Sequence, residues 1–393
     1  MSTSTRRSFI RTSAAIGISA MAYKRVASAV THGARPLIAF VGCGGRAQGL
    51  SQGFADDADV AWVCDPDSRR AAQLQQKTGA KQTTNDLRKV LDDQSVDAIV
   101  VATPDHWHAP AAIMACDAGK HVYVEKPCSH NLREGRLLVE AARRNNVVVQ
   151  HGTQSRSSTF IANAIQMLRE GKIGDVLMAK GWNVQRRNNI GHADPSTPPA
   201  GVDYDTWVGP ARMMPFQSNR FHYNWHWFWD TGNGETGNNG PHLFDLARWA
   251  LRQYEHPKTI QSVGGYYGFD CDQQTPNTQL SSLQYADGSL VQLDVRNLYS
   301  NNLTGEDFVP LFYGTDGLKR FLGRFQAREG LKWFLPLLGF FLVFGFAGRF
   351  IGSAAVGIEF DPKFWGWAWV AQVMLMQLLI PGLGEEFGWR GFA

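Results

Sequence analysis

The stretch LIAFVGCGGRA, residues 37–47, decides the fold of this 393-residue chain. Five apolar residues typical of a β-strand lead into a glycine turn, and a helical pattern begins where the turn ends. In this G-x-G-x-x-A spacing, Gly42 permits a tight turn, Gly44 lets a phosphate approach the backbone, and Ala47 allows close helix–strand packing. The helix N-terminus would then offer free N–H groups and partial positive charge to the phosphate.

Short β-rich runs alternate with amphipathic helical patterns around this turn. The expected strands are 37–41, 60–64, 98–102, 121–124 and 147–150, and the expected helices are 46–55, 67–78, 108–119 and 131–145. Such alternation predicts a doubly wound, Rossmann-type α/β domain with a parallel sheet over residues 30–150.

An acidic residue in the expected place strengthens the prediction of a dinucleotide site. Asp65 ends the second expected strand, 21 residues beyond Gly44, where a carboxylate can accept both ribose hydroxyls. Because that carboxylate would repel a 2′-phosphate, NAD is the favoured cofactor. Arg46, Arg69 and Arg70 lie close enough in the sequence to leave NADP open.

A second domain is expected over residues 151–317. Its expected helices are 156–170 and 238–253, its expected strands are 175–183, 259–268, 279–286 and 289–297, and a loop-rich, Trp-rich insertion spans 186–235. This order predicts an α+β domain with an open, mostly antiparallel sheet. We expect this domain to be incomplete at its C-terminal end.

Two segments that follow the third and fourth expected strands carry candidate chemistry. They are Thr103-Pro104-Asp105-His106-Trp107-His108 and Glu125-Lys126-Pro127. Open α/β sheets bind ligands beyond the carboxyl ends of their strands, so both segments are expected at the cofactor site. A lysine there could hydrogen-bond a substrate hydroxyl and assist its deprotonation, whereas the alternative is a solvated surface cation.

Together these residues resemble the Gfo/Idh/MocA family of NAD(P)-dependent oxidoreductases over about residues 36–317. The likeness continues in the motifs at 203–210, 221–230 and 237–242. It implies hydride transfer between a sugar or cyclitol carbon and the nicotinamide. It also implies these cofactor-binding residues: Gly42, Gly44, Arg46, Ala47, Asp65, Thr103, Pro104, His108, Glu125 and Lys126.

The resemblance implies that Lys126 is the family's lysine and that His242 exchanges the hydroxyl proton. Many members carry an aspartate four residues before this histidine, where this chain has Asn238. An amide can orient a hydroxyl but cannot take its proton, so proton exchange is expected at His242, with Asp245 as an orienting partner. The alternative for His242 is a histidine of the core.

Aromatic residues at 221–229 could stack on a sugar, and Trp225, His226 and Trp227 are the expected substrate contacts. Packing in a lid or an oligomer contact is an equal alternative. A metal site built from His222, His226, Asp230 and Glu235 is not expected, since no tight ligand motif is present.

The N-terminal residues 1–29 resemble a twin-arginine signal peptide. Arg6-Arg7 precedes a mildly apolar run at 14–23, and Ala27-Ser28-Ala29 offers a cleavage site. Export to the periplasm is therefore expected, and an ordinary cytoplasmic leader is the alternative.

The C-terminal residues 318–393 have the composition of a membrane protein. Residues 333–358 are apolar apart from Arg349, and residues 364–383 carry no charge, so two membrane helices and membrane association through 331–383 are expected. Glu385, Glu386 and Arg390 resemble the E-E-x-x-x-R motif of CPBP intramembrane proteases. The last histidine is His256, so no complete metal site and no protease activity are expected. We interpret 1–317 and 318–393 as parts of two joined genes, with a membrane anchor as the alternative.

Charge and cysteine content exclude further classes. A formal net charge of +4 without a long basic run does not indicate a nucleic-acid-binding surface. Five scattered cysteines indicate neither a zinc ribbon nor a disulfide framework. The expected partners are a small carbohydrate or cyclitol and, for the soluble part, a second copy of the chain. The alternatives are an NAD-dependent glycoside hydrolase on the same fold and an inactive chimeric product.

Overall fold

The computed structural model describes residues 35–298 and 308–316. The predictions for 1–29 and 318–393, with Glu385 and Glu386, lie outside the described residues. One compact unit includes the described residues up to Gln166 and from Met178 to Phe312, and the described residues 167–177 and 313–316 belong to a second unit.

A six-stranded sheet with the order β3-β2-β1-β4-β5-β6 forms the first half of the described chain. All of its pairs are parallel. Its strands are β1 (Leu37–Val41), β2 (Asp59–Cys64), β3 (Gln82–Thr84), β4 (Ala98–Val101), β5 (His121–Val124) and β6 (Val149–His151). The predicted doubly wound Rossmann-type sheet is confirmed, and the short polar strand β3 was not predicted.

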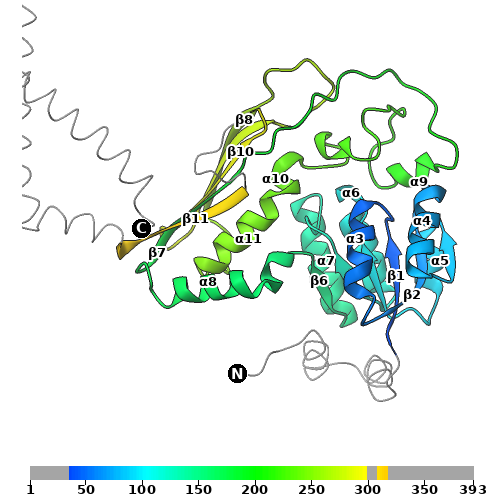
Figure 1. Cartoon of the computed structure of the whole chain (residues 1–393), viewed down its shortest axis with the longest axis horizontal. Coiled ribbons are helices and arrows are strands. Elements are labelled where there is room, and N and C mark those ends of the chain that lie inside the picture. Colours follow the sequence, from blue (N-terminus) through cyan, green and yellow to red (C-terminus); the bar gives the residue numbers. More distant parts are fainter. Residues whose placement is uncertain (1–34, 299–307, 317–393) are drawn as a thin grey trace, which may run out of the picture. The chain divides into compact units, whose positions relative to one another are not determined.

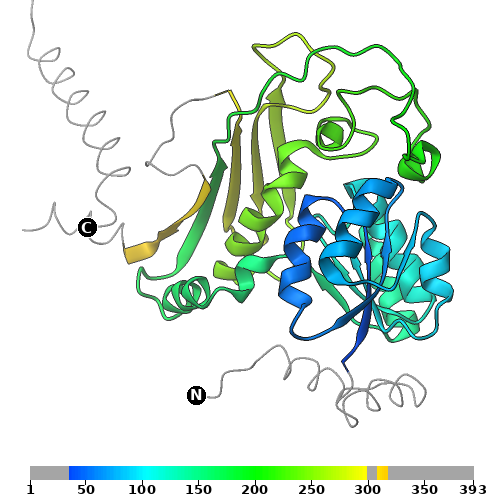
Figure 2. The same ribbon diagram turned by 45° about the vertical axis from the view of Figure 1, so that its right-hand side comes forward.

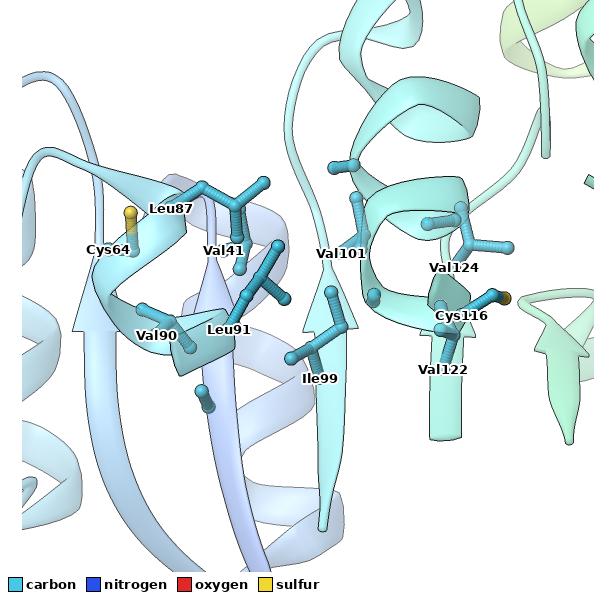
Figure 3. Packing of buried hydrophobic residues seen from close by; sticks show 14 of the residues in the cluster. Val41, Cys64, Leu87, Val90, Leu91, Ile99, Val101, Cys116, Val122 and Val124 are labelled. Carbon is cyan, nitrogen blue, oxygen red and sulfur yellow. The ribbon is translucent and has the colours of Figure 1, made fainter. Parts of the chain in front are cut away.

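Helices cover both faces of this sheet because the side chains of each strand alternate between the faces. Ile38 and Phe40 pack with residues of α3 and α4, whereas Ala39 and Val41 pack with residues of α5, α6 and α7. Figure 3 shows the second of these clusters, which joins Val41, Ile99 and Val101 to Leu87, Val90 and Leu91 of α5. The helices are α3 (Gly45–Phe54), α4 (Ser68–Thr78), α5 (Leu87–Asp92), α6 (Asp105–Asp117) and α7 (Leu132–Asn145).

A second, five-stranded sheet has the order β11-β7-β10-β9-β8. Strand β10 pairs in parallel with β7, and the pairs β10–β9 and β9–β8 are antiparallel. Its strands are β7 (Val176–Asn183), β8 (Thr259–Gly265), β9 (Thr278–Gln284), β10 (Leu290–Arg296) and β11 (Phe308–Gly314). The predicted strands are therefore present, and β11 is an additional one.

One helix covers a face of this second sheet, as Figures 1 and 2 show for α11. Leu243 and Phe244 of α11 pack on Leu293 and Val295 of β10. The predicted helix 238–253 is in fact two helices, α10 (Gly234–Asn238) and α11 (Gly240–Ala250). The remaining helical elements are α8 (Thr159–Arg169), α9 (Tyr204–Val208) and the 3₁₀ turns η1 (Gln154–Ser157) and η2 (Asn224–Trp227).

Within the described ranges, no helix has both the length and the hydropathy needed to cross a bilayer. The two segments expected to do so fall in the part of the chain that is not described.

We predict that Leu293→Ala lowers the free energy of unfolding by about 2–5 kcal/mol, because the side chain is fully buried between β10 and α11. Urea denaturation of the full chain measures the change. Leu280→Ala on β9 is the matched control, since that leucine is 40% exposed, and we expect a change of about 0.5 kcal/mol or less. Equal effects of the two substitutions would contradict the packing described for α11.

Candidate functional site

A pocket of about 780 Å³ lies at the carboxyl ends of β1, β2, β4 and β5. Twelve of the residues predicted to act at the site line it: Gly42, Gly44, Arg46, Asp65, Thr103, Pro104, His108, Glu125, Lys126, Trp225, His226 and Asn238. Ala47, Trp227, His242 and Asp245 do not line it. The structure therefore brings both strand-end segments to one pocket.

The glycine turn has the geometry that a phosphate site requires. Gly42 has a φ of +84°, and a Cβ there would lie 2.7 Å from the carbonyl group of Ala102 and the nitrogen of Thr103. Gly44 precedes α3 without any side-chain cap, and Gly44, Gly45 and Arg46 line the pocket. The first-turn N–H groups of α3 therefore remain available for an anion, which fits the pyrophosphate of a dinucleotide.

Asp65 is buried and anchored to the same turn. Its carboxylate accepts hydrogen bonds from the N–H of Cys43 at 2.6 Å and of Asp67 at 2.8 Å. Burial raises the pKa of Asp65, and the two N–H donors oppose that shift. Each carboxylate oxygen keeps a second lone pair, so Asp65 can still accept a ribose hydroxyl.

The three candidate arginines have different surroundings. Arg69 pairs with Asp67 at 3.1 Å, and Arg46 donates to Glu125 at 2.7 Å. Arg70 lines the pocket, with its Nη1 3.0 Å from where a Cβ on Gly44 would lie. Of the three, Arg70 is therefore the arginine placed beside the phosphate-binding turn.

Both ring nitrogens of His108 face backbone carbonyl oxygens, and the single N–H of a neutral imidazole can donate to one of the two. Its Nδ1 lies 2.5 Å from the carbonyl oxygen of Pro127, and its Nε2 lies 2.8 Å from that of Thr103. Burial lowers the pKa of His108. His108 lines the pocket with both ring nitrogens facing backbone carbonyls, and its expected contact with the cofactor stays a prediction. Thr103 has a buried Oγ1 without a partner among the described residues and still lines the pocket.

Lys126 lies at the centre of the candidate chemistry. Its Nζ donates to the backbone oxygen of Asn238 at 2.7 Å and to the side-chain Oδ1 of the same residue at 3.0 Å. Burial lowers the pKa of Lys126, while the charges of Asp105 and Glu125 oppose that shift. The interpretation of Lys126 as a solvated surface cation is therefore wrong.

A buried glutamate orients the amide that holds Lys126. Glu235 has a fully buried side chain and accepts from Arg187 Nε at 2.5 Å. It also accepts from the amide nitrogens of Asn183 at 2.7 Å, Asn239 at 2.8 Å and Asn238 at 3.5 Å. The donor end of the Asn238 amide thus faces Glu235, and its acceptor end faces Lys126. The sequence hinted at Glu235 only as a metal ligand.

His242 lies near Lys126 but lacks its predicted partner. Its Nδ1 is buried without a hydrogen bond to any described residue. Burial and then the charge of Lys126 lower its pKa. Asp245 pairs with Arg156 at 2.7 and 2.9 Å, so the prediction that Asp245 orients His242 is wrong.

The aromatic segment is only partly at the pocket. The rings of Trp225 and His226 stack with centroids 3.6 Å apart, and both residues line the pocket. Trp227 is buried beneath Arg187, whose guanidinium lies 5.5 Å from the ring centroid, so its predicted substrate contact is wrong. Burial lowers the pKa of His226 to about 3.

Two other histidines near the pocket are also held by neighbouring groups. His222 lies 2.9 Å from Asp67, and His106 faces the carbonyl oxygens of Trp207 at 3.1 Å and Thr231 at 3.3 Å. Burial lowers the pKa of both histidines to about 4. In the part of the chain that the structure describes, no three His, Cys, Asp or Glu residues gather as metal ligands.

Asp105, the first residue of α6, is a site residue that the sequence analysis did not select. It lines the pocket, is only 2% exposed, and its Oδ2 makes no hydrogen bond to a described residue. Burial raises its pKa to about 8, against the opposing charge of Lys126. The only signal in the sequence was an acid placed directly after Thr103-Pro104.

Two models of one oxidoreductase family match the chain. The NAD-binding Rossmann fold matches residues 37–153, and the C-terminal alpha/beta domain matches residues 179–306. The first described domain is therefore an NAD-binding Rossmann domain.

Three curated relatives are similar over part of their length. A levoglucosan dehydrogenase of Pseudarthrobacter phenanthrenivorans is 26% identical over 201 residues, 51% of this chain and 45% of the relative. A scyllo-inositol 2-dehydrogenase (NAD(+)) of Bacillus subtilis is 31% identical over 32% of this chain and 36% of the relative. A glycosyl hydrolase family 109 protein of Shewanella pealeana is 28% identical over 36% of this chain and 33% of the relative. The chain spans less than half the length of these relatives.

The fold is similar to that of levoglucosan dehydrogenase solved in complex with NADH and levoglucosan. The TM-score is 0.56 at 20% sequence identity, over 72% of this chain and 71% of the other. At this identity the likeness concerns the fold alone.

We predict that Gly42→Ala weakens NADH binding about tenfold or more, because a Cβ at this position distorts the turn that would hold the phosphates. A loss of about 1.4 kcal/mol of binding free energy corresponds to a factor of ten in affinity. The added Cβ would meet the Ala102–Thr103 backbone at 2.7 Å. Gly49→Ala, further along α3, is the control, because this residue does not line the pocket and its Cβ would meet nothing within 4 Å. Titration of NADH fluorescence measures both affinities, and an unchanged affinity in Gly42→Ala would contradict the assigned phosphate site.

Asp105 gives a prediction on stability and pH. Its folded pKa of about 8 lies above the unfolded value of about 3.9, so the folded chain holds a proton that the unfolded chain releases. The stabilisation is complete below about pH 4 and is lost as the pH rises to about 8.

Asp105→Asn has no carboxyl to ionise, so its free energy of unfolding should not fall in this way. The difference in free energy of unfolding between Asp105→Asn and the wild type should therefore grow between about pH 5 and 8, by up to about 1.4 kcal/mol per pH unit. Asp117→Asn, at the other end of α6, is the control: Arg144 holds the pKa of Asp117 below its usual value, so no gain is expected in this range. Parallel stability curves for Asp105→Asn and the wild type would refute the assignment.

Proposed function

The chain belongs to the Gfo/Idh/MocA family of oxidoreductases, and we propose that it transfers a hydride between a hydroxyl-bearing carbon of a sugar or cyclitol and NAD. The observation that carries this proposal is the position of Lys126. Its Nζ is held by two oxygens of Asn238 in the same pocket as the glycine turn. The expectation of an NAD-dependent dehydrogenase from the sequence rests on the same residues.

The residues of the first domain fit a dinucleotide. The turn at Gly42 and Gly44 and the N-terminus of α3 would hold the pyrophosphate, and Asp65 would hold a ribose. When bound, the nicotinamide supplies the hydride acceptor. Asp65 favours NAD, and Arg70 beside Gly44 is the residue through which a 2′-phosphate would be accommodated.

Of the two residues expected to handle the substrate proton, Lys126 lines the pocket and His242 does not. An ammonium that donates twice to Asn238 has a third N–H, which can orient the substrate hydroxyl and stabilise negative charge on its oxygen. Burial and the charge of Lys126 lower the pKa of His242 and favour a neutral imidazole, but His242 does not line the pocket and its Nδ1 is buried, so the structure gives it no contact with a substrate hydroxyl. Asn238 has no proton to exchange and serves as the holder of Lys126.

The ring pair at the pocket supports a carbohydrate substrate. Trp225 stacks on His226, and the pair presents an aromatic surface with a polar edge to the pocket. Such surfaces suit a ring that carries C–H groups on its face and hydroxyls on its rim. A volume of about 780 Å³ has room for a sugar beside the nicotinamide end of a cofactor.

We predict that Lys126→Met lowers the rate of sugar oxidation by about 10²–10⁴-fold, because it removes the ammonium that orients and stabilises the substrate oxygen. NADH affinity, measured by fluorescence, should stay within about tenfold. Lys81→Met, on the exposed surface, is the control and should keep the wild-type rate. A panel of sugars and cyclitols is assayed at the absorbance of NADH, and wild-type activity in Lys126→Met would reject the assigned role.

A glycoside hydrolase that uses NAD transiently is the second candidate. The similarity to a glycosyl hydrolase family 109 protein favours it, whereas Glu125-Lys126-Pro127 favours dehydrogenation. Release of the phenol from an aryl glycoside without net reduction of NAD would reverse the order of the two proposals.

Export and membrane association are also proposals, and both concern residues outside the described ranges. Replacing Arg6-Arg7 with lysines should retain the protein in the cytoplasm if residues 1–29 form a twin-arginine signal. Membrane fractionation tests the apolar segments within 331–383, and the intact mass tests whether 1–317 and 318–393 are made as one molecule. Formation of a homo-oligomer stays a prediction, which light scattering can measure.

A further inference from the structure

One carboxyl group in the pocket has no function in the proposed reaction. Asp105 opens α6 directly after Thr103-Pro104, and its side chain is buried although it lines the pocket. Its Oδ2 finds no hydrogen-bond donor among the described residues. Buried polar atoms are nearly always paired, so an unpaired carboxylate oxygen at a ligand pocket calls for an explanation.

The position of this carboxyl relates it to Lys126. Asp105 Oδ2 lies 3.5 Å from where a Cβ on Gly237 would be. The next residue in the chain is Asn238, whose two oxygens hold the Lys126 ammonium. Lys126 is also the charge that acts on the Asp105 carboxyl. The acid and the amine therefore both line the pocket beside the same short segment of α10, Gly237–Asn238.

The other charged groups around Lys126 already have partners. The charges that act most strongly on Lys126 are those of Asp105 on α6, the adjacent Glu125, Arg46 on α3 and Glu235 on α10. Four histidines also face its charge: His108, His151, His226 and His242. Glu125 pairs with Arg46, and Glu235 pairs with Arg187 and accepts from asparagine amides. Of these three carboxyl groups, Asp105 is therefore the one that forms no ion pair with a described arginine.

We propose that Asp105 is a positioning residue that acts through Lys126, exchanging a proton with its amine and so setting the pH range over which the ammonium is present. The inference rests on the proposed function, in which that ammonium stabilises the substrate oxygen. The exchange moves one proton from a carboxylic oxygen to the amine nitrogen. One O–H bond breaks, one N–H bond forms, and the pair keeps its total charge.

Burial explains why the pocket needs such a group. Asn238 offers two dipoles to the ammonium but no charge, and removal from water disfavours an isolated cation. A nearby carboxylate restores the preference for the ammonium. When the pair is instead the neutral acid and the neutral amine, the pocket holds no uncompensated charge from either group.

The experiment measures the protonation of Lys126 directly. The full chain is labelled with trace acetic anhydride across about pH 6 to 11, a range that brackets the pKa of a perturbed lysine. The fraction acetylated at Lys126 is read by mass spectrometry of its peptide. We expect the labelling midpoint to fall by about one unit in Asp105→Asn, because the amine loses its carboxylate partner. Asp105→Ser should shift it in the same direction, and Asp105→Glu should restore it in part.

Asp117→Asn is the matched control on the same helix and should leave the midpoint unchanged, since Asp117 is exposed and pairs with Arg144. In assays of sugar oxidation, the alkaline limb of kcat should move to lower pH with the labelling midpoint. The KM for NAD should stay constant, which a general distortion of the pocket would not allow.

The two proposals fail in different ways. A labelling midpoint that is the same in Asp105→Asn, Asp105→Ser and the wild type overturns the inference, even if the wild type oxidises sugars. A shifted midpoint in a chain that oxidises no sugar supports the exchange between Asp105 and Lys126 and rejects the proposed oxidation instead.

Discussion

The candidate site depends on how closely two backbones approach between the ends of β1 and β4. Only a glycine fits at residue 42, where a Cβ would lie 2.7 Å from backbone atoms of Ala102 and Thr103. Because β1 and β4 are adjacent parallel strands, this approach brings the start of α3 beside the start of α6. Asp65 is tied to the same turn through the N–H of Cys43. One steric constraint thus aligns the phosphate site, the ribose carboxylate and the segment that leads to Asp105.

The carboxyl groups around Lys126 are buried, so their interactions matter more for stability than those of ion pairs on the protein surface. Exposed ion pairs contribute little and can be lost without consequence, whereas a buried charge needs a fixed environment. Here Glu235 forms an ion pair with Arg187 and does not contact the lysine directly. Glu235 instead accepts a hydrogen bond from the amide of Asn238, which orients the amide oxygen toward Lys126. The lysine itself is held by the dipoles of Asn238, so its charge state remains free to change. This arrangement separates the groups that give rigidity from the group that reacts.

Local patterns in the sequence predicted most of the first domain. Apolar runs, glycine chemistry and one acidic residue determine the strand, turn and helix from Leu37 to Phe54, and each acts over a short range. Strand β3 escaped prediction because its Gln-Thr-Thr sequence lies at the sheet edge and shows no apolar alternation. The start of α6 was placed at 108 instead of Asp105, since no amphipathic pattern marks its first turn.

The errors at the site come from partners that are distant in sequence. Asp245 lies one turn from His242, so the helical period suggested a contact, but Arg156 from η1 takes the carboxylate. Glu235 could be assigned its role only through Arg187, 48 residues earlier in the chain. Trp227 has the composition of a sugar-binding residue and is instead buried against that same arginine. Contacts between side chains that are distant in the sequence, unlike the alternation of residues in a strand, produce no recognisable local sequence pattern.

The buried histidines have a consequence for the acid side of the stability curve. His106, His222 and His226 have pKa values of about 4, 4 and 3 in the fold, below the unfolded value of about 6.5. Unfolding therefore takes up protons at these sites as the pH falls below about 6.5, while Asp105 makes unfolding release a proton up to about pH 8. The lowered pKa values of His108 and His242 act in the same direction as those of these three histidines, and the raised pKa of Asp65 acts in the same direction as that of Asp105. These histidines therefore lower the stability of the fold as the pH falls below about 6.5, and Asp105 lowers it as the pH rises from about 4 to 8.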